Sequence, residues 1–297
     1  MAVYDIDGNL LTSSAYDVDG NLVTLGYDID GNIAYNSDSI ILKVMAFNVG
    51  CFYTEYFPCP DAVENSFYQR HQTIFGNYNP DICGMPEWYK YIGTIESANL
   101  MDEYWSSYVP NYEAYNGSSK PNNAITFAST YTISNPSIVR YATQNGEVRY
   151  YQKGYINVDG KSICIANTHL ALNSAREDQF EEYLDMLENE EYFIATGDFN
   201  FQVQTVGDSE YNASIQLALD RGFNSAQNAN SILKTWYSGQ TEASSTNKYA
   251  LDNIITSSNI DIAQVLVDTT KLTDGLCTAN SIIIDHLPLV AYVVIND

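Results

Sequence analysis

The stretch Tyr192–Asn200 reads Tyr-Phe-Ile-Ala-Thr-Gly-Asp-Phe-Asn, and the rest of the chain is best understood from it. Its first four residues favour a buried strand, and a Thr-Gly break then precedes a polar end. Side chains alternate along a strand, so Asp198 and Asn200 share one side while Phe199 packs on the other. A carboxylate and a carboxamide at a strand end suit a divalent cation, a phosphate or an attacking water. An ordinary polar turn is the alternative interpretation.

Other apolar, strand-like segments of the chain also end in, or carry, polar side chains of the kinds that bind metals or move protons. Such groups can form one site only where the fold brings the strand ends together. In chain order, these polar residues are Asn48, Glu87, His169, Asp252, Asp285 and His286.

The apolar pattern predicts several helices. The clearest covers residues 174–190, with Phe180, Tyr183, Leu184 and Leu187 on one face. Residues 61–79 and 90–104 also have helical character.

Between residues 123 and 165 three β-type runs follow one another, with Asn145-Gly146 and Asp159-Gly160 as turns, which is typical of antiparallel pairing. Later strands are predicted at Tyr249–Thr256 and Ser281–Val294. Strands alternating with helices, together with antiparallel runs, predict an α+β fold in which two sheets pack face to face with helices outside.

The first 36 residues contain three copies of Tyr-Asp-x-Asp-Gly-Asn, which begin at Tyr4, Tyr16 and Tyr27. Asp-Gly-Asn between short β-type runs predicts one strand and one tight turn per unit. Calcium loops also contain Asp-x-Asp-Gly, but the later acidic ligand of an EF-hand is missing, so turns are preferred. Because such a unit cannot bury its own apolar face, we expect residues 1–36 to serve self-association or attachment to a larger assembly.

The composition restricts the class of protein. The chain has 297 residues, with 37 acidic and 13 basic side chains and a net charge of −24. This charge argues against a protein that binds nucleic acid through a broad basic face. An enzyme can still bind a single phosphodiester group at a site where a metal ion offsets the electrostatic repulsion. The sequence shows no secretory signal and no apolar stretch of membrane-spanning length, which predicts a cytoplasmic protein or a component of a viral particle.

The five cysteines lack the spacing of a metal site. Cys83 and Cys164 lie in apolar, strand-like runs and are predicted to be core thiols. Cys51 and Cys59 are close enough in sequence to form a disulfide, although the spacing does not require one. The remaining histidine, His71, is predicted to lie at the surface.

Taken in chain order, the polar motifs resemble the endonuclease/exonuclease/phosphatase superfamily, which has the DNase I-like fold. The likeness covers residues 40–297 and implies a four-layer αββα sandwich, with residues 38–297 as a catalytic domain that hydrolyses phosphoester bonds. The motifs that carry it are Asn48, Pro-Glu87, Asn-Thr-His169, Gly-Asp198-Phe-Asn200, Leu-Asp252 and Asp285-His286-Leu-Pro.

The resemblance implies a metal centre in which Glu87 is the principal ligand, helped by Asn48 and Asp285. The implied ion is Mg²⁺, with Mn²⁺ or Ca²⁺ as alternatives. Hard oxygen ligands of this kind suit Mg²⁺, which keeps several of its waters.

The resemblance also implies catalytic roles for the remaining residues. Asp198 and Asn200 would position the attacking water and the scissile phosphate. His286, oriented by Asp252, would activate water or stabilise the phosphorane, and His169 would bind phosphate oxygens or serve the leaving group. Histidines shuttle protons near neutral pH, and a carboxylate partner fixes their tautomer.

We therefore expect a metal-dependent phosphodiesterase, and more specifically a DNase I-like nuclease that acts on nucleic acid. Within the same superfamily, a phosphatase or phospholipase acting on inositol phosphate or sphingomyelin is the alternative. A virion or surface component with a catalytically silent domain is the alternative outside enzymes. The aromatic loop 51–57 could stack on bases, contact lipid or form a buried lid. Pro86 stands where many relatives have Gln, and this departure from the family pattern leaves the identity of the substrate undetermined.

Overall fold

The structure is a computed structural model. The residues it describes are 15–16, 22–23, 26–27, 33–34, 40–48, 76–87, 106–108, 125–146, 148–228, 230, 232–237, 248–268 and 286–295.

Several sequence predictions fall outside these residues. Residues 76–78 form a helical turn, but the rest of the helix expected over 61–79 is not among the described residues. The other predictions outside the described residues are the helix over 90–104, the aromatic loop 51–57, the pairing of Cys51 with Cys59, the position of His71, and the metal ligand Asp285.

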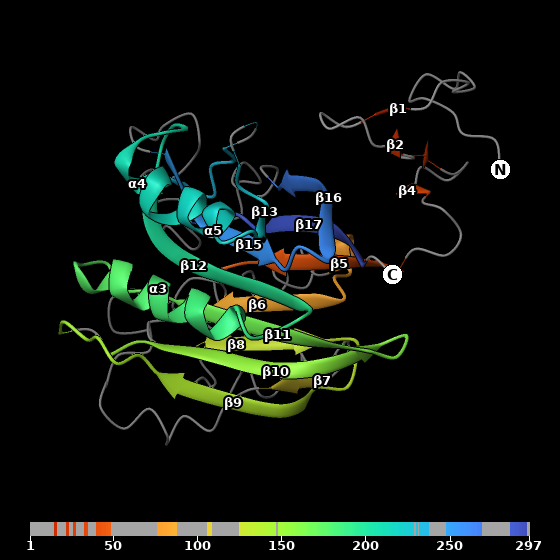
Figure 1. Ribbon diagram of the computed structural model, residues 1–297, viewed down its shortest axis with the longest axis horizontal. Coiled ribbons are helices and arrows are strands. Elements are labelled where there is room, and N and C mark those ends of the chain that lie inside the picture. The colour runs from red at the N-terminus through yellow and green to blue at the C-terminus, as the bar shows by residue number, and fades with distance from the viewer. Residues whose placement is uncertain are drawn as a thin grey trace, which may run out of the picture.

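Two mixed β-sheets lie face to face and form the body of the described chain (Figure 1). We name them sheet I and sheet II. In sheet I the parallel pair is β11 with β12, and the other neighbours are antiparallel. The strand order of sheet I is β13 (Asn224–Ser225), β15 (Lys248–Thr256), β12 (Phe193–Val203), β11 (Lys161–His169), β10 (Tyr150–Val158) and β9 (Ser134–Arg140), with β14 (Trp236–Tyr237) also paired to β15.

Sheet II is built from segments that lie before and after sheet I in the chain. Its parallel pair is β5 with β6, and the other neighbours are antiparallel. The chain leaves sheet II after β8, forms all of sheet I, and returns with β16 and β17. The strand order of sheet II is β16 (Ile260–Val267), β17 (Leu289–Ile295), β5 (Ile40–Ala46), β6 (Ile82–Pro86), β8 (Ile125–Ser129) and β7 (Ser106–Tyr108).

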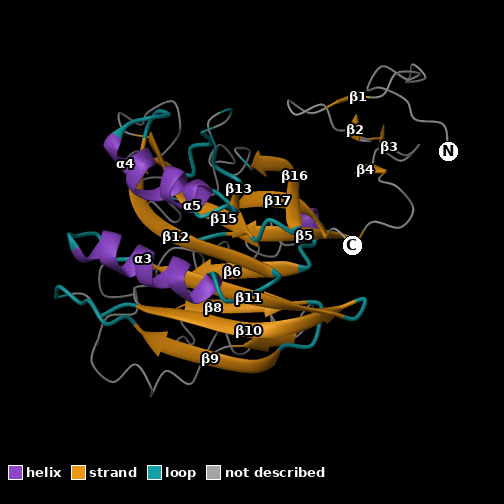
Figure 2. Cartoon of the chain, in the orientation of Figure 1, coloured by secondary structure: helices purple, strands orange, loops and turns teal. Residues whose placement is uncertain are grey.

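Helices cover the outer face of sheet I (Figure 2). The longest is α3 (Ala175–Leu187), and the predicted apolar face is confirmed, because Phe180, Tyr183, Leu184 and Leu187 are all buried. A short run of α4 (Ser209–Tyr211), η3 (Asn212–Gln216) and α5 (Leu217–Asp220) packs beside it.

The layers described are thus helices, sheet I and sheet II, which is consistent with the αββα sandwich that the sequence predicts. The prediction that Cys83 and Cys164 are core thiols is also confirmed, because both are buried and free.

Two sequence predictions are wrong in detail. Of the three β-type runs between 123 and 165, the second and third pair antiparallel as predicted, as β10 and β11. The first run does not join them, because β8 belongs to sheet II and an unpredicted strand, β9, leads the chain into sheet I. Local alternation of apolar residues does not specify which sheet a strand joins. The Thr-Gly pair at 196–197 does not break its strand either, since β12 runs through it.

The hairpin between β10 and β11 has the turn that its sequence predicts. Asp159 and Gly160 have φ angles of 50° and 85°, which is the left-handed pair of a type I′ turn. This turn sets the antiparallel register that carries β11 to His169.

The repeat region contributes two short antiparallel pairs. β1 (Ala15–Tyr16) pairs with β2 (Leu22–Val23), and β3 (Gly26–Tyr27) pairs with β4 (Ile33–Ala34). Each pair flanks one Asp-x-Asp-Gly-Asn segment, whose residues are not among those described. The role of this region in assembly stays a prediction.

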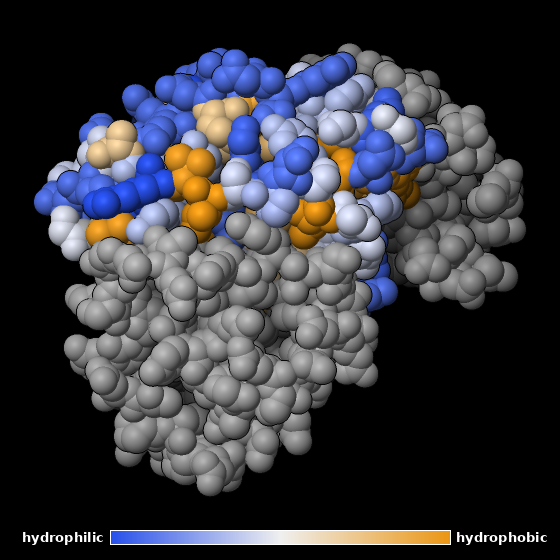
Figure 3. Space-filling model, turned by 90° about the horizontal axis from the view of Figure 1, so that it is seen from below, coloured by the Kyte–Doolittle hydropathy of each residue, from blue (hydrophilic) through white to orange (hydrophobic). Residues whose placement is uncertain are grey.

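The described part of the face in Figure 3 is mainly hydrophilic, and hydrophobic residues form separate small patches on it. Among the described residues, Leu172 and Val206 are the large hydrophobic side chains with high exposure. Within the same residues, no helix combines the length and the apolar character that crossing a bilayer requires.

Candidate active site

Three of the predicted site residues lie in one row across sheet I. His169 on β11 is in register with Asp198 on β12, which is in register with Asp252 on β15. Residues in register on neighbouring strands point to the same face. This is the face that packs against sheet II, because Ile165, Ile194 and Ile254, at even spacing from the row, belong to the core between the sheets.

A polar layer lies directly beneath this row, where the two sheets approach closely. Thr196 Oγ1 donates a hydrogen bond to the backbone oxygen of Ala166 at 3.1 Å, and Asn167 Nδ2 reaches across to the backbone oxygen of Thr126 in sheet II at 2.8 Å. Gly84 on β6 faces this layer, and a Cβ there would lie 1.8 Å from Thr196 Oγ1. Only glycine fits this contact without displacing buried neighbours.

Sheet II supplies its site residues from positions just outside its strands. Asn48 follows β5, Glu87 follows β6, and His286 precedes β17. The amide of Asn48 lies 2.9 Å from Asp198 Oδ2 and 3.3 Å from Glu87 Oε1. Glu87 has a left-handed φ of 63°, which few residues other than glycine adopt and which turns the chain sharply after β6.

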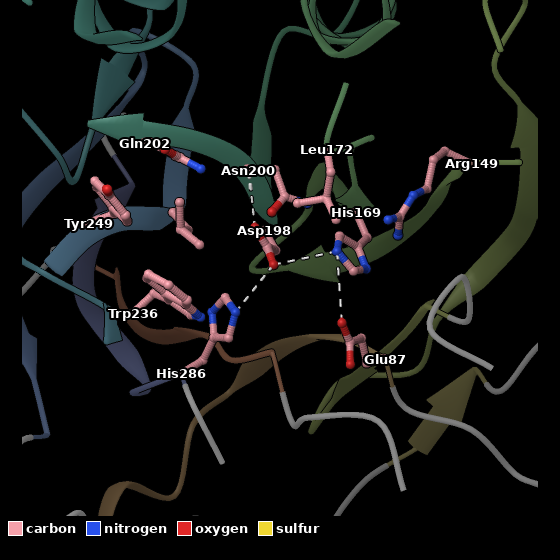
Figure 4. A pocket seen from close by; sticks show the side chains of 11 residues that line it. Glu87, Arg149, His169, Leu172, Asp198, Asn200, Gln202, Trp236, Tyr249 and His286 are labelled. Atoms are coloured by element: carbon pink, nitrogen blue, oxygen red, sulfur yellow. Dashed lines mark hydrogen bonds and ion pairs between the residues drawn. The ribbon is translucent and has the colours of Figure 1, made fainter. Parts of the chain in front are cut away.

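Asp198 is the centre of the site (Figure 4). His169 Nε2 lies 3.4 Å from Asp198 Oδ2 and 4.0 Å from Glu87 Oε1. His286 Nε2 lies 3.6 Å from the same Asp198 oxygen. The other ring nitrogen of His286, Nδ1, is 2.8 Å from Asp252 Oδ2. The Asp252 carboxylate therefore fixes the ring of His286 and directs Nε2 toward Asp198.

Burial raises the pKa of Asp198 from 3.8 to about 7. The charge of His286 and the hydrogen bond from Asn48 oppose this rise, whereas the negative charges of Asp252 and Glu87 add to it. A carboxyl whose pKa lies near neutral can take up and release a proton at physiological pH.

The described residues include one cluster that could hold a metal ion, formed by Asp198, Asp252 and His286, whose ligand atoms lie within 4.8 Å of one another. Asp252 Oδ1 is buried and has no hydrogen-bond partner in the described part of the chain. A buried carboxylate oxygen without a donor fits a cation or an ordered water. The residues present are therefore compatible with a divalent ion.

Asn200 adds an amide to the same region. It has a left-handed φ of 56°, its N–H donates to Asp198 Oδ1 at 2.9 Å, and its Nδ2 donates to the backbone oxygen of Leu170 at 2.8 Å. Phe199 packs on the opposite side against Phe180, as the alternation in the sequence predicts.

These groups line a cavity of about 260 Å³. Around Asp198 and His169 the wall is polar, and an apolar part includes Leu172. The lining residues are Glu87, Arg149, His169, Leu172, Asp198, Asn200, Gln202, Trp236, Tyr249, Leu251 and His286.

Sequence reasoning missed six residues of this wall, and three of them have charged or aromatic side chains. Arg149 is 1% exposed although it is charged, and it lies on the side of His169 (Figure 4). Trp236 and Tyr249 lie on the side of His286, with their rings stacked at 5.4 Å and an interplanar angle of 15°. In an acidic chain with 13 basic residues, an arginine just before the apolar run of β10 was an available signal.

The structure thus brings together seven of the eight residues that the sequence predicts. The eighth, Asp285, is not among the described residues. The seven that meet are Asn48, Glu87, His169, Asp198, Asn200, Asp252 and His286.

The chain has the same fold as solved structures of endonuclease/exonuclease/phosphatase family proteins, which is the fold that the resemblance implies. No protein-family model matches the sequence, and no curated protein matches it either. The fold is therefore shown by solved structures rather than by sequence similarity.

Three solved structures illustrate the likeness. An endonuclease/exonuclease/phosphatase family protein from Bacteroides thetaiotaomicron has a TM-score of 0.62 at 15% identity, over 88% of this chain and 100% of that one. Truncated TDP2 from Caenorhabditis elegans has a TM-score of 0.57 at 16% identity, over 86% and 97%. ANGEL2, a 2′,3′-cyclic phosphatase, has a TM-score of 0.62 at 13% identity, over 89% and 98%.

Proposed function

We propose that this protein is a metal-dependent phosphodiesterase that hydrolyses phosphodiester bonds of nucleic acid. The observation that carries the proposal is the position of Asp198, whose carboxylate lies within 3.6 Å of Asn48, His169 and His286 at the edge of one cavity. Hydrolysis of a phosphodiester requires an oriented water, a proton acceptor and groups that stabilise charge on the phosphate, and this arrangement offers all three.

The cavity wall favours a nucleotide as substrate. Arg149 offers a buried positive charge for a phosphate, and the Trp236–Tyr249 stack offers an aromatic surface for a base. A volume of about 260 Å³ suits one nucleotide unit better than a length of duplex. Two similar structures contain related ligands: D. rerio TDP2 is complexed with a single-strand DNA product, and ANGEL2 with adenosine-2′,3′-vanadate.

In the proposed mechanism, Asp198 takes the proton of the attacking water. Its pKa of about 7 suits this role near neutral pH. Asn48 and Asn200 hold its two carboxylate oxygens through N–H groups at 2.9 Å, which fixes the direction from which it can accept a proton. His286, whose ring is held by Asp252, and His169 face the same carboxylate and would donate hydrogen bonds to phosphate oxygens.

Glu87, Asn48 and Asp285 would hold the Mg²⁺ ion. When bound, the ion would neutralise charge on the phosphate. The carboxylate of Glu87 and the amide of Asn48 lie together at 3.3 Å, and hard oxygen donors of this type suit Mg²⁺, with Mn²⁺ or Ca²⁺ as alternatives. The cluster of Asp198, Asp252 and His286 is a second position compatible with a cation.

The test is cleavage of plasmid and of single-stranded oligonucleotides with Mg²⁺ and with EDTA. We expect metal-dependent cleavage that Glu87→Gln and His286→Ala strongly reduce at the Mg²⁺ concentration that saturates the wild type, while both variants stay folded by circular dichroism. Glu190→Gln is the matched control, because Glu190 binds Lys153 at 3.1 Å and does not line the cavity. Full activity of Glu87→Gln or His286→Ala would contradict the assigned roles.

The same assay separates the other members of the class. Inositol phosphates and sphingomyelin are tested beside the nucleic acids under identical metal conditions. Turnover of either without cleavage of nucleic acid would assign the site to a phosphatase or a phospholipase. No metal-dependent turnover of any substrate would favour a silent domain.

We also propose that residues 1–36 act in assembly or attachment, separately from the catalytic domain at 38–297. The three repeats support this, since short strand-and-turn units need neighbours to bury their apolar faces. Light scattering of the full chain and of a chain that starts at Ser37 tests it. We expect a larger particle for the full chain, and identical monomers would contradict the proposal.

A further inference from the structure

Arg176 extends from the first turn of α3 to the end of β12, beside the cavity but not in its lining. Its Nη1 donates to the backbone oxygen of Asn200 at 2.6 Å, and its guanidinium lies 4.4 Å from the centre of the Phe201 ring. Its Nη2 lies 2.9 Å from Glu210, whose carboxylate accepts the backbone N–H of Gln202 at 3.0 Å. We call this pair the Arg176–Glu210 clamp. It holds three successive residues of β12.

The clamp acts where β12 loses its regular pairing. The register with β11 ends at Asp198, and the register with β15 shifts between Asp198 and Val203. Within this bulge Asn200 adopts its left-handed φ of 56°. Such a backbone is disfavoured for a residue other than glycine and persists only where surrounding contacts hold it. Backbone groups in a bulge also need partners outside the ladder, and the clamp supplies them for Asn200 and Gln202.

The bulge is connected directly to the reactive carboxyl group. The N–H of Asn200 donates to Asp198 Oδ1 at 2.9 Å, and the Asn200 side chain donates to the backbone of Leu170 at 2.8 Å. A change in the Asn200 backbone would therefore turn both its own amide and the carboxylate of Asp198. Displacements of about 1 Å at a reacting group can lower rates by about 100-fold.

The clamp is itself anchored. Glu210 lies in the first turn of α4, and Asp208 caps this helix by accepting the N–H of Tyr211 at 2.7 Å. Asp208 also accepts the N–H of Thr205, in the loop before the helix, at 3.0 Å. The side chains of Arg176 and Glu210 are 14% and 31% exposed, so solvent screens the pair less than a surface ion pair.

We propose that Arg176, together with Glu210, is a positioning residue for the reaction: it holds the left-handed bulge at Asn200 and through it the orientation of the Asp198 carboxylate. This inference rests on the proposed phosphodiesterase function. Arg176 does not line the cavity, so its effect is transmitted through the backbone of β12.

The test compares Arg176→Ala with Arg221→Ala. Arg221 is a matched control, because it also joins this helical layer through two carboxylates, Asp185 of α3 at 2.6 Å and Glu188 directly after α3 at 2.9 Å, with 18% exposure of its side chain. With bis(p-nitrophenyl) phosphate and Mg²⁺, we expect Arg176→Ala to lower kcat by about 10- to 100-fold with little change in KM. Arg221→Ala should change kcat by less than about twofold.

Two further measurements separate positioning from general loss of structure. If Arg176 acts through Asn200, the double variant Arg176→Ala/Asn200→Ala should have the same kcat as Asn200→Ala alone. For Arg221→Ala combined with Asn200→Ala, the fold-losses in kcat of the two single variants should instead multiply. Added guanidinium at non-denaturing concentration should restore part of the rate of Arg176→Ala and not that of Arg221→Ala. If Arg176→Ala does not fold, Arg176→Lys takes its place, since lysine can reach only one of the two partners.

Hydrogen exchange tests the structural part of the inference whether or not the wild type turns over. The amides of Asn200 and Gln202 should exchange faster in Arg176→Ala than in the wild type, and not in Arg221→Ala. Unchanged exchange, wild-type kcat in Arg176→Ala, or multiplicative losses in the double variant would each overturn the inference. A wild type without phosphodiesterase activity would contradict the proposed function. Hydrogen exchange at Asn200 and Gln202 would then still test whether Arg176 holds the bulge of β12.

Discussion

The two sheets contribute to the site in different ways. Sheet I presents His169, Asp198 and Asp252 from within three long, paired strands, in a single register row. Sheet II presents Asn48 and Glu87 from positions just beyond the ends of β5 and β6. Asp198 is 1% exposed, whereas the Glu87 side chain is 18% exposed.

This difference indicates that the two sets of residues have different functions. Residues inside a paired ladder have fixed directions, which suits groups that must meet a water or a proton within tenths of an ångström. Residues at strand ends can adjust, which suits ligands of an ion that enters and leaves. We expect the row in sheet I, together with His286, to control the rate of the chemical step and the end of β6 to control the affinity for metal.

The largest effect should come from Asp198→Asn. Loss of the proton acceptor should lower kcat by about 1,000-fold, while the Mg²⁺ concentration for half-maximal rate stays nearly constant. Glu87→Gln should instead raise that Mg²⁺ concentration strongly. Titration of the residual activity with Mg²⁺ measures both. The division between the sheets is wrong if the two variants show the reverse pattern.

The next effect should come from the contact between the sheets. Gly84→Ala places a Cβ 1.8 Å from Thr196 Oγ1 and 2.7 Å from Asn167 Oδ1, so the sheets must separate beneath the site. We expect a loss of about 3 kcal/mol in the free energy of unfolding, measured with urea. Gly76→Ala is the control, because a Cβ there has no atom within 4 Å. Equal stability of the two variants would show that the sheets can adapt.

A smaller effect is expected in the dependence of the free energy of unfolding on pH. The pKa of Asp198 is raised to about 7 in the folded protein, so the folded state keeps a proton that the unfolded state releases above its ordinary pKa of 3.8. The free energy of unfolding of the metal-free protein should therefore fall as pH rises toward 7, by roughly 1.4 kcal/mol per pH unit at most. Urea denaturation at pH 5 and pH 7 tests this. The decrease should be weaker in Asp198→Asn, and an equal decrease in both proteins would assign the effect to other groups.

The smallest effect concerns the aromatic wall that β14 and β15 build at the edge of sheet I. Trp236→Leu should raise KM about tenfold for an oligonucleotide with a base at the cleaved position, since stacking stabilises a bound base by roughly 1–3 kcal/mol. It should leave KM unchanged for an oligonucleotide with an abasic site there. Equal changes for the two substrates would show that the ring does not contact a base.

Much of this site could be predicted from sequence because its residues stand on strongly apolar strands. Asp198 and Asn200 were expected on one face opposite Phe199, and the packing of Phe199 on Phe180 agrees with that alternation. The left-handed backbone of Asn200 could not be predicted, because it depends on a shift in register with β15.

Other features depend on contacts between distant segments. Arg149 and Trp236 were missed because neither follows an apolar strand, and their contact with the cavity is set by the packing of sheets. The pairing of β8 was predicted wrongly for the same reason, since β6, its partner in sheet II, is distant in sequence.

The order of strands in the chain has a consequence for biosynthesis. All of sheet I, from β9 to β15, is synthesised before β17, and sheet II joins β17 to β5 only after His286 has been made. The two halves of the site therefore cannot be completed on a nascent chain until its residues near 295 emerge.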